Sequence, residues 1–428
     1  MKQLTLPQQV ARMDGPRLQA YRENLEFYRG TQWREGPRRG ERRLTLNYAK
    51  AFVEKVTSYL MGGVLIYVDA DDSSDSARER AQRAQHALRD VYRRNNLVQL
   101  DFDTELDAAI LGDGCFKVTW DSSEQRVRVS APDVQGVFAW WLGDDVNRIW
   151  RIASRYTLSA DEASLLYGVS IAAEEATILE VWTVDRFQLW IDEAQVEDRR
   201  NPYGFIPFVI YPNLREPKQF WGVSDIEAIR EPSRELNRAL SHLSTIIELS
   251  GNPIAVLENV EQAEDIAVQP GAVWELPERA RAYLLDLLQG GGVRHHIDYI
   301  DCLFRALHDL SESPRTAFGD NRQGLSGVAL EMELHPIVQK VRRKQLIRSA
   351  AYCRRAEMIL SILEQKGGER YLPCRPRIEW GPVLPPDRSR LVHDEQVLVE
   401  AGLHSRRRAM AELGIENPDE ELKRMQEE

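Results

Sequence analysis

Cysteine is scarce in this chain of 428 residues. The four thiols are scattered and form no Cys-x-x-Cys pair. A structural zinc site needs closely spaced ligands, and a disulfide framework needs many more cysteines in a short chain. We therefore expect buried or incidental thiols kept in a reducing compartment at Cys115, Cys302, Cys353 and Cys374.

Long apolar runs are also missing. A membrane-spanning helix needs about 20 consecutive apolar residues, and no stretch of the chain approaches that length. The first residues, MKQLTLPQQVARMDG, lack the apolar core of an export signal. The sequence therefore predicts neither an export signal nor a membrane partner.

Several catalytic motifs are absent as well. The dipeptide Gly-Lys never occurs, so there is no phosphate-binding loop of the Walker type, and GxGxxG, HExxH and GxSxG are missing too. These absences argue against nucleotide hydrolysis and several familiar enzyme families. We expect a protein that is not an enzyme and that needs no cofactor.

Positive charge is in deficit. Aspartate and glutamate number 67 against 56 lysines and arginines, which gives a formal net charge of −11. Strong, wholesale capture of nucleic acid by a basic surface is therefore not expected. Hydrophobic residues make up 43% of the chain, enough for the cores of two or three domains at this length.

Two groups of residues have the chemistry of metal ligands but the wrong spacing. His295 and His296 are adjacent, so they point in different directions on a helix. Carboxylates that alternate along a helix are likewise scattered around it, and we expect no metal site. The alternating carboxylates are Asp101, Asp103, Glu105 and Asp107. If they did bind a metal ion, the alternative function would be that of a metal-dependent enzyme acting on nucleic acid.

The segment 294–363 organises the rest of the chain. Apolar residues at three- and four-residue spacing predict a helix over 293–310 and a second helix from about 326 to 365. Between them lies a polar loop rich in proline and glycine. Pro336 predicts a kink in the second helix rather than its end. About 40 helical residues extend roughly 60 Å, which calls for a large core or for neighbouring subunits.

The other elements follow in blocks. The first 111 residues read as helices, apart from one strand near residue 64, and short strands with period-two patterns begin at Phe116. A helix capped by Ser224 runs to about residue 250, and a compact insert, 251–292, separates it from the helix 293–310. This order predicts an antiparallel helical pair with a small cap at its tip.

One segment of the long helix is strongly basic. Residues 339–355 contain seven basic side chains and no acidic one. Two interpretations remain open: a helix face paired with acidic neighbours, including those of other subunits, or contact with nucleic acid. The residues are Lys340, Arg342, Arg343, Lys344, Arg348, Arg354 and Arg355.

Several short motifs, taken in order, resemble a known family. They are LQAYRENLEFYRGTQW, LNYAKAFVEKVTSYLMGG, AAILGDGCFKVTWD, YGFIPFVIYPN followed by FWGVSDIEAIREPSRELNRALSHL, and GLSGVALEMEL. Together they resemble the portal (head-to-tail connector) proteins of tailed bacteriophages, of the long-tailed siphovirus type.

The resemblance implies an α+β, mainly helical portal fold with a defined order of parts. These would be an α/β wing at 1–222, a stem helix at 223–250, a small α/β clip at 251–292, a second stem helix at 293–312, a tunnel loop at 313–326, a long kinked wing helix with a return strand at 327–379, and a helical crown at 380–428.

The resemblance also implies a function. Such a protein would form a ring of about twelve subunits at one capsid vertex. The ring would be the channel for DNA packaging and ejection and would dock the terminase packaging motor and the head-tail adaptor. Scaffold and major capsid protein would be further partners, with assembly in the host cytoplasm and a final place in the virion. Another ring-forming virion protein is the alternative.

The predicted tunnel loop supplies the candidate contacts to double-stranded DNA. DNA must slide through a channel, so we expect few, non-specific phosphate contacts. The candidate residues are Arg315, Asn321, Arg322 and Gln323.

Overall fold

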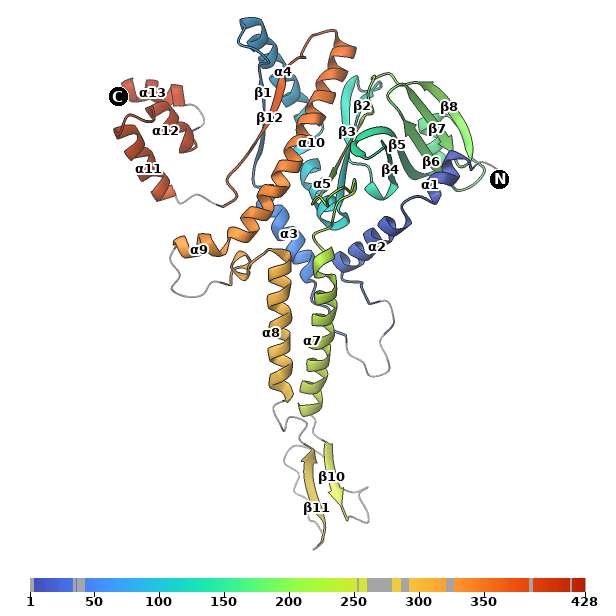
Figure 1. The fold of residues 1–428 in the computed structure, drawn as a ribbon, viewed down its shortest axis with the longest axis vertical. Coiled ribbons are helices and arrows are strands. Elements are labelled where there is room, and N and C mark those ends of the chain that lie inside the picture. Colours follow the sequence, from blue (N-terminus) through green and yellow to red (C-terminus); the bar gives the residue numbers. More distant parts are fainter. Residues whose placement is uncertain are drawn as a thin grey trace. The chain divides into compact units, whose positions relative to one another are not determined.

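The structure is a computed structural model that describes residues 4–33, 36, 43–251, 254–259, 279–285, 292–320, 327–384, 388–415 and 418–427. The chain divides into two compact units, Met1–Met61 with Ile66–Glu379, and Gly62–Leu65 with Trp380–Glu428. The fold is mainly helical with small antiparallel sheets, which confirms the predicted α+β class (Figure 1).

The first part of the chain is helical, as predicted. Its helices begin and end at ordinary signals: the side chains of Asn47 and Ser74 accept N-cap hydrogen bonds, and Gly30 and Gly112 close two helices in the left-handed conformation. The helices are α1 (Leu6–Ala11), α2 (Gly15–Arg29), α3 (Tyr48–Leu60), α4 (Asp75–Arg94) and α5 (Leu97–Leu111).

Two antiparallel sheets follow. The first has the order β3-β2-β9, and the second is a five-stranded meander, β4-β5-β6-β7-β8, with α6 (Ala160–Tyr167) after β5. The strands are β2 (Asp113–Asp121), β3 (Arg126–Ser130), β4 (Val137–Leu142), β5 (Asp145–Ser159), β6 (Glu175–Trp182), β7 (Arg186–Ile191), β8 (Ala194–Arg200) and β9 (Phe208–Pro212). Only β8, with the polar sequence AQVEDRR, was not predicted.

Two long helices pack side by side, α7 (Arg230–Gly251) and α8 (Gly292–Ser311) (Figure 1). Leucines of α7 and apolar residues of α8 share one core with α2, α3 and α5. In sequence, the hairpin β10 (Ile254–Glu258) and β11 (Arg281–Leu285) lies between the two helices, and within the described residues β10 pairs only with β11. The predicted order of helix, insert and helix is present.

The start of α7 differs from the prediction. Ser224 does not cap the long helix, because its hydroxyl donates to the carbonyl of Ile110 at 2.6 Å. The turn η2 (Glu227–Ile229) intervenes, and α7 begins at Arg230. Pro232 therefore lies in the first turn, where its missing N–H costs no helical hydrogen bond.

The predicted long helix is divided. α9 (Gly327–Glu333) and α10 (His335–Gly367) are separated by Leu334 alone. Pro336 lies in the first turn of α10, where it has no N–H to donate to the Met332 carbonyl. A proline that was expected to kink one helix instead begins a second one.

The end of the chain returns through a strand to short helices. β12 (Arg375–Trp380) pairs with β1 (Val64–Asp69). The second compact unit contains α11 (Arg388–Glu400), α12 (Arg406–Glu412) and α13 (Pro418–Glu427). The acidic end of the chain contributes α13.

Candidate channel loop and the ion network behind it

The loop after α8 begins with a short helical turn, η3 (Arg315–Phe318). Ala317 is buried, whereas Arg315 is exposed, with its guanidinium carbon 5.5 Å from the centre of the Phe304 ring. The other predicted loop residues, Asn321, Arg322 and Gln323, lie outside the described residues. Arg315 is therefore the one loop candidate whose position the structure gives.

Three aromatic rings fix the start of this loop. Phe52 of α3, His308 of α8 and Phe318 of η3 contact one another edge to face, with ring centres 5.1 to 5.6 Å apart. The Nδ1 atom of His308 lies 2.6 Å from the carbonyl oxygen of Ser313. Burial, with a further contribution from Arg315, lowers the pKa of His308. A neutral ring that donates from Nδ1 fits this environment.

Helices α9 and α10 hold the loop from the other side. The hydroxyl of Thr316 donates to Glu333 at 2.5 Å, and Arg343 pairs with Glu312. The ammonium group of buried Lys340 donates to the carbonyl of Ser311 at 3.0 Å. A cleft of about 380 Å³ remains beside Arg315, with Asp320 and Glu333 also on its wall.

Behind the loop lies a buried ion network, formed by residues of α5, α10 and the segment that precedes α7. Lys340 reaches Asp225 at 3.1 Å, and Lys344 lies 2.6 Å from Asp225 and 3.4 Å from Glu105. Arg348 makes two hydrogen bonds to Glu105, of 2.8 and 2.9 Å. Lys344, Arg348 and Glu105 are fully buried away from solvent, so their charges must be balanced by one another.

The network has a second, nearby part. Arg355 binds the Asp101 carboxylate through both terminal nitrogens and also donates to the hydroxyl of Tyr92 at 3.0 Å. At Asp225, burial alone would raise the pKa of the carboxyl, but the ammonium groups of Lys340 and Lys344 outweigh it and hold that pKa below its usual range. Asp225 therefore remains charged at neutral pH.

The family of the chain follows from a comparison with known protein families. A family model described as "Phage portal protein, SPP1 Gp6-like" matches residues 16–428. The chain belongs to this portal family. No curated protein matches it. The family match over residues 16–428 confirms the resemblance drawn from the motifs. The portal protein is thus a head-to-tail connector of a bacteriophage virion that serves in DNA packaging.

The motifs that carried the resemblance also build the portal's ion network. Asn213 ends the motif YGFIPFVIYPN, and both its side chain and its carbonyl accept hydrogen bonds from Arg348. Asp225 lies in the motif FWGVSD, and its carboxylate accepts from Lys344. Sequence reasoning used these motifs as signs of family but did not identify their role as partners of the basic helix.

The basic segment of the portal does not form one surface patch, which corrects that part of the prediction. Lys340, Lys344, Arg348 and Arg355 are buried and paired with acidic residues of the same chain. The interpretation of a helix face paired with acidic neighbours applies to these four, with partners inside the subunit. The exposed members are Arg342, Arg343, which pairs with Glu312, and Arg354, which pairs with Glu357.

The four alternating carboxylates of α5 likewise fall into a buried pair and an exposed pair. Asp101 and Glu105, four residues apart, face the core and bind arginines, whereas Asp103 and Asp107 are exposed. Among the residues that the structure describes, no group of three or more metal-ligating side chains is placed to hold a metal ion. Within the same residues, no helix is both long and apolar enough to cross a membrane.

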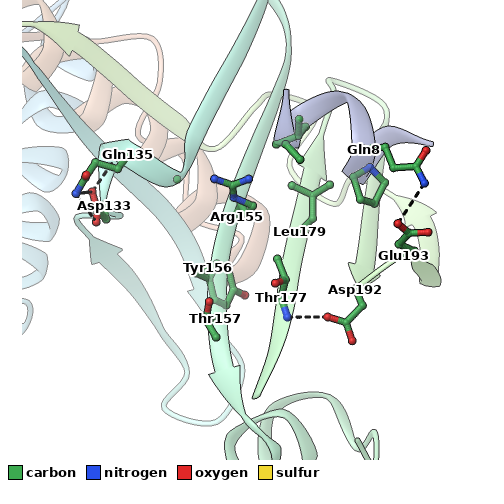
Figure 2. A pocket seen from close by; sticks show the side chains of 14 residues that line it. Gln8, Asp133, Gln135, Arg155, Tyr156, Thr157, Thr177, Leu179, Asp192 and Glu193 are labelled. Atoms are coloured by element: carbon green, nitrogen blue, oxygen red, sulfur yellow. Dashed lines mark hydrogen bonds between the residues drawn. The ribbon is translucent and has the colours of Figure 1, made fainter. Parts of the chain in front are cut away.

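A separate cavity of about 670 Å³ lies between α1, the turn η1 (Val134–Gly136) and strands β5 and β6 (Figure 2). Hydrogen bonds within its walls join Gln8 to Glu193 and Asp192 to the backbone of Thr177. None of its lining residues belongs to the predicted loop or to the basic segment. The cavity is therefore not part of the candidate channel site.

Proposed function

We propose that the portal protein forms a closed ring of about twelve copies at one capsid vertex, through which DNA is packaged and later ejected. The observation that carries this proposal is the family match over residues 16–428. Large apolar side chains left exposed on the paired helices support it, since neighbouring copies would cover them. Ile247 is 59% exposed and Ile297 49% exposed.

The charge of the chain suits passage of DNA. Twelve copies at −11 each would carry about −132 (12 × −11). Only the residues that face the channel act on DNA, and weak, non-specific phosphate contacts there would let DNA slide instead of binding tightly. Arg315 would supply a weak, non-specific contact at the loop, together with Asn321, Arg322 and Gln323. Arg342, Arg343 and Arg354 are proposed for contacts with neighbouring subunits or DNA.

The parts of the chain would have distinct partners. In this proposal, as membership of the portal family suggests, the clip, 251–292, meets the terminase packaging motor and afterwards the head-tail adaptor. Scaffold and major capsid protein would be further partners, and the crown, 380–428, would lie inside the capsid. The role is structural rather than catalytic, with assembly in the host cytoplasm.

The alternatives have less support. For a metal-dependent enzyme, the carboxylates of Asp101 and Glu105 would have to bind a cation, yet arginine nitrogens already occupy them. For a ring-forming virion protein without a DNA channel, the insert between the two long helices would be expected to pack back onto the sheets. Within the described residues, its strands β10 and β11 pair only with each other.

Electron microscopy of the purified protein tests the proposal. End-on views should show rings of about twelve subunits with a central hole wide enough for a DNA duplex, roughly 20 Å. A closed ring without a through-channel would contradict passage of DNA. Monomers alone, even with scaffold protein present, would contradict the ring itself.

A further inference from the structure

The two stem helices carry opposite charges on the faces that point away from each other. In α7, Leu236 packs toward α8, and arginines lie two residues to either side of it, at 234 and 238. Two residues correspond to about 200° of rotation, so Arg234 and Arg238 lie on the far side of the helix. By the same geometry Asp298, two residues before Ile300, lies on the far side of α8, and Asp301 is one turn further along.

The arginine face of α7 is only loosely paired. Arg238 is exposed and bridges to Glu235 at 2.9 Å, three residues earlier on the same helix. Arg234 pairs with Glu231 in the same manner. Arg234 also lies 5.3 Å from the centre of the Phe27 ring, and both arginines line a cleft with Glu23, Trp33 and Arg43 of the same chain. The ion pairs within the helix contribute only about 0.3–0.5 kcal/mol each, so acidic groups of another copy can replace them.

The aspartate face of α8 has no such pairs. Asp298 and Asp301 are exposed, and neither has an ion-pair partner within the residues that the structure describes. Ile297, beside them, also lacks a cover. Exposed apolar surface next to unpaired charge is the composition of an interface that another chain completes.

Both faces lie at the same height along the helical pair. The hydroxyl of Tyr299 on α8 donates to Glu235 on α7 at 3.0 Å, which places these two residues opposite each other. Because the helices run antiparallel, residues 234 and 238 of α7 lie level with about 300 and 296 of α8. Both arginines therefore lie within about 3 Å of the height of Asp298, and Arg234 lies about 1.5 Å from the height of Asp301.

We propose that Arg234 and Arg238 of one copy pair with Asp298 and Asp301 of the next copy around the ring. This inference rests on the proposed ring. Rotation about an axis preserves height along it, so helical pairs that run along the ring axis bring these charges level between neighbours. The contact is head-to-tail, since one face of each copy meets a different face of the next. The occupant of both faces is a second copy of this chain.

Charge reversal tests this pairing by ring formation, counted in electron micrographs. We expect the fraction of particles that are rings to be at least tenfold lower for D298R/D301R than for the unchanged protein. In this variant four arginines would face one another at each interface. The fraction should be as low for R234E/R238E, because four acidic residues then meet. A 1:1 mixture of the two variants should regain rings, since each interface in an alternating ring again joins opposite charges.

The matched control is R78E/R89E, which changes the charge equally on exposed positions of α4. It should form rings like the unchanged protein. If either stem variant forms normal rings while the unchanged protein does, the pairing is overturned and the ring proposal stands. If neither stem variant forms rings and their 1:1 mixture forms none either, the pairing is again overturned. If the unchanged protein forms no ring with scaffold present, both proposals fail together.

Discussion

Arg348 is fully buried, and its guanidinium makes five hydrogen bonds, to Glu105, to Asn213 and to the carbonyl of Pro212. Its removal leaves the charge of Glu105 inside the protein with only the more distant Lys344 as partner. Arg348→Ala should therefore lower the free energy of unfolding by about 3–5 kcal/mol. Denaturant titration of tryptophan fluorescence at fixed protein concentration measures this change.

The control is Arg342→Ala on the same helix. Arg342 is exposed, and surface substitutions usually change stability by less than about 0.5 kcal/mol. Equal unfolding midpoints for the two variants would show that the buried network does not hold α10 against α5.

Asp113 gives a prediction about pH. It is buried, and it accepts hydrogen bonds from the hydroxyl of Tyr21 at 2.5 Å and from the backbone N–H of Gly222 at 2.8 Å. Burial outweighs these bonds and raises the pKa of Asp113 from 3.8 to about 6. The folded state therefore holds this proton more tightly than the unfolded chain, and the contribution of Asp113 to stability falls as pH rises from about 4 to 6.

Asp113→Asn should remove that dependence. The shift of about two pKa units corresponds to about 3 kcal/mol, so the stability of the unchanged protein relative to the variant should decrease by up to that amount between pH 4 and pH 7. Urea titrations at both pH values measure the difference, with exposed Asp103→Asn as control. A difference that is constant over this range would contradict the prediction.

Some of these residues could be predicted from sequence only as a pattern. Asp101 and Glu105 are four residues apart, and so are Lys340, Lys344 and Arg348, which places each set on one helix face. Charged side chains are almost never fully buried unless paired, and the basic set alone left open whether its partners were acidic neighbours or nucleic acid. The pairing depends on how α5 and α10 cross, and no local pattern contains that information.

At the scale of elements, Lys340 links α10 to the end of α8 and to the segment that precedes α7. Its ammonium group binds the carbonyl of Ser311 at the end of α8 and the carboxylate of Asp225 before α7. Lys340→Met should free both ends. Amide hydrogen exchange over 311–320 should quicken by about tenfold or more, equivalent to a local loss of about 1.4 kcal/mol.

Arg343→Met is the matched control, since Arg343 binds Glu312 in the same segment but at the exposed surface. Its exchange over 311–320 should change by no more than about fivefold, because exposed ion pairs contribute about 0.2–1 kcal/mol. If the two variants exchange alike, burial of Lys340 is not what fixes the loop.

Elements with a regular pattern were predictable, and those without one were not. The apolar spacing of 293–310 predicted α8 within a residue at each end, and period-two runs predicted β2 to β7. Strand β8 has a polar sequence and is almost entirely exposed, so it lacks the apolar pattern by which strands are predicted. Backbone pairing with β7 stabilises it instead of burial in a hydrophobic core. The division between α9 and α10 depends on how far the chain turns at Leu334, which a proline signal alone does not determine.

At the scale of the whole molecule, the central prediction concerns Arg315. It is exposed at the start of the loop and lies beside the ring of Phe304. In a ring, about twelve copies of this guanidinium would face the channel, each offering one phosphate contact. Arg315→Ala should leave ring formation unchanged, because in the described residues this side chain has no ion-pair partner to lose.

DNA retention is the property expected to change. Particles assembled with Arg315→Ala should lose packaged DNA several-fold more often than normal particles, and the loss should grow with salt, which screens the remaining contacts. The fraction of full particles after storage at two salt concentrations measures this. Arg89→Ala, which removes an exposed arginine from α4, should retain DNA normally. Equal retention in both variants would place the DNA contact at other residues, because a channel that holds DNA through this loop cannot lose a ring of positive charges without effect.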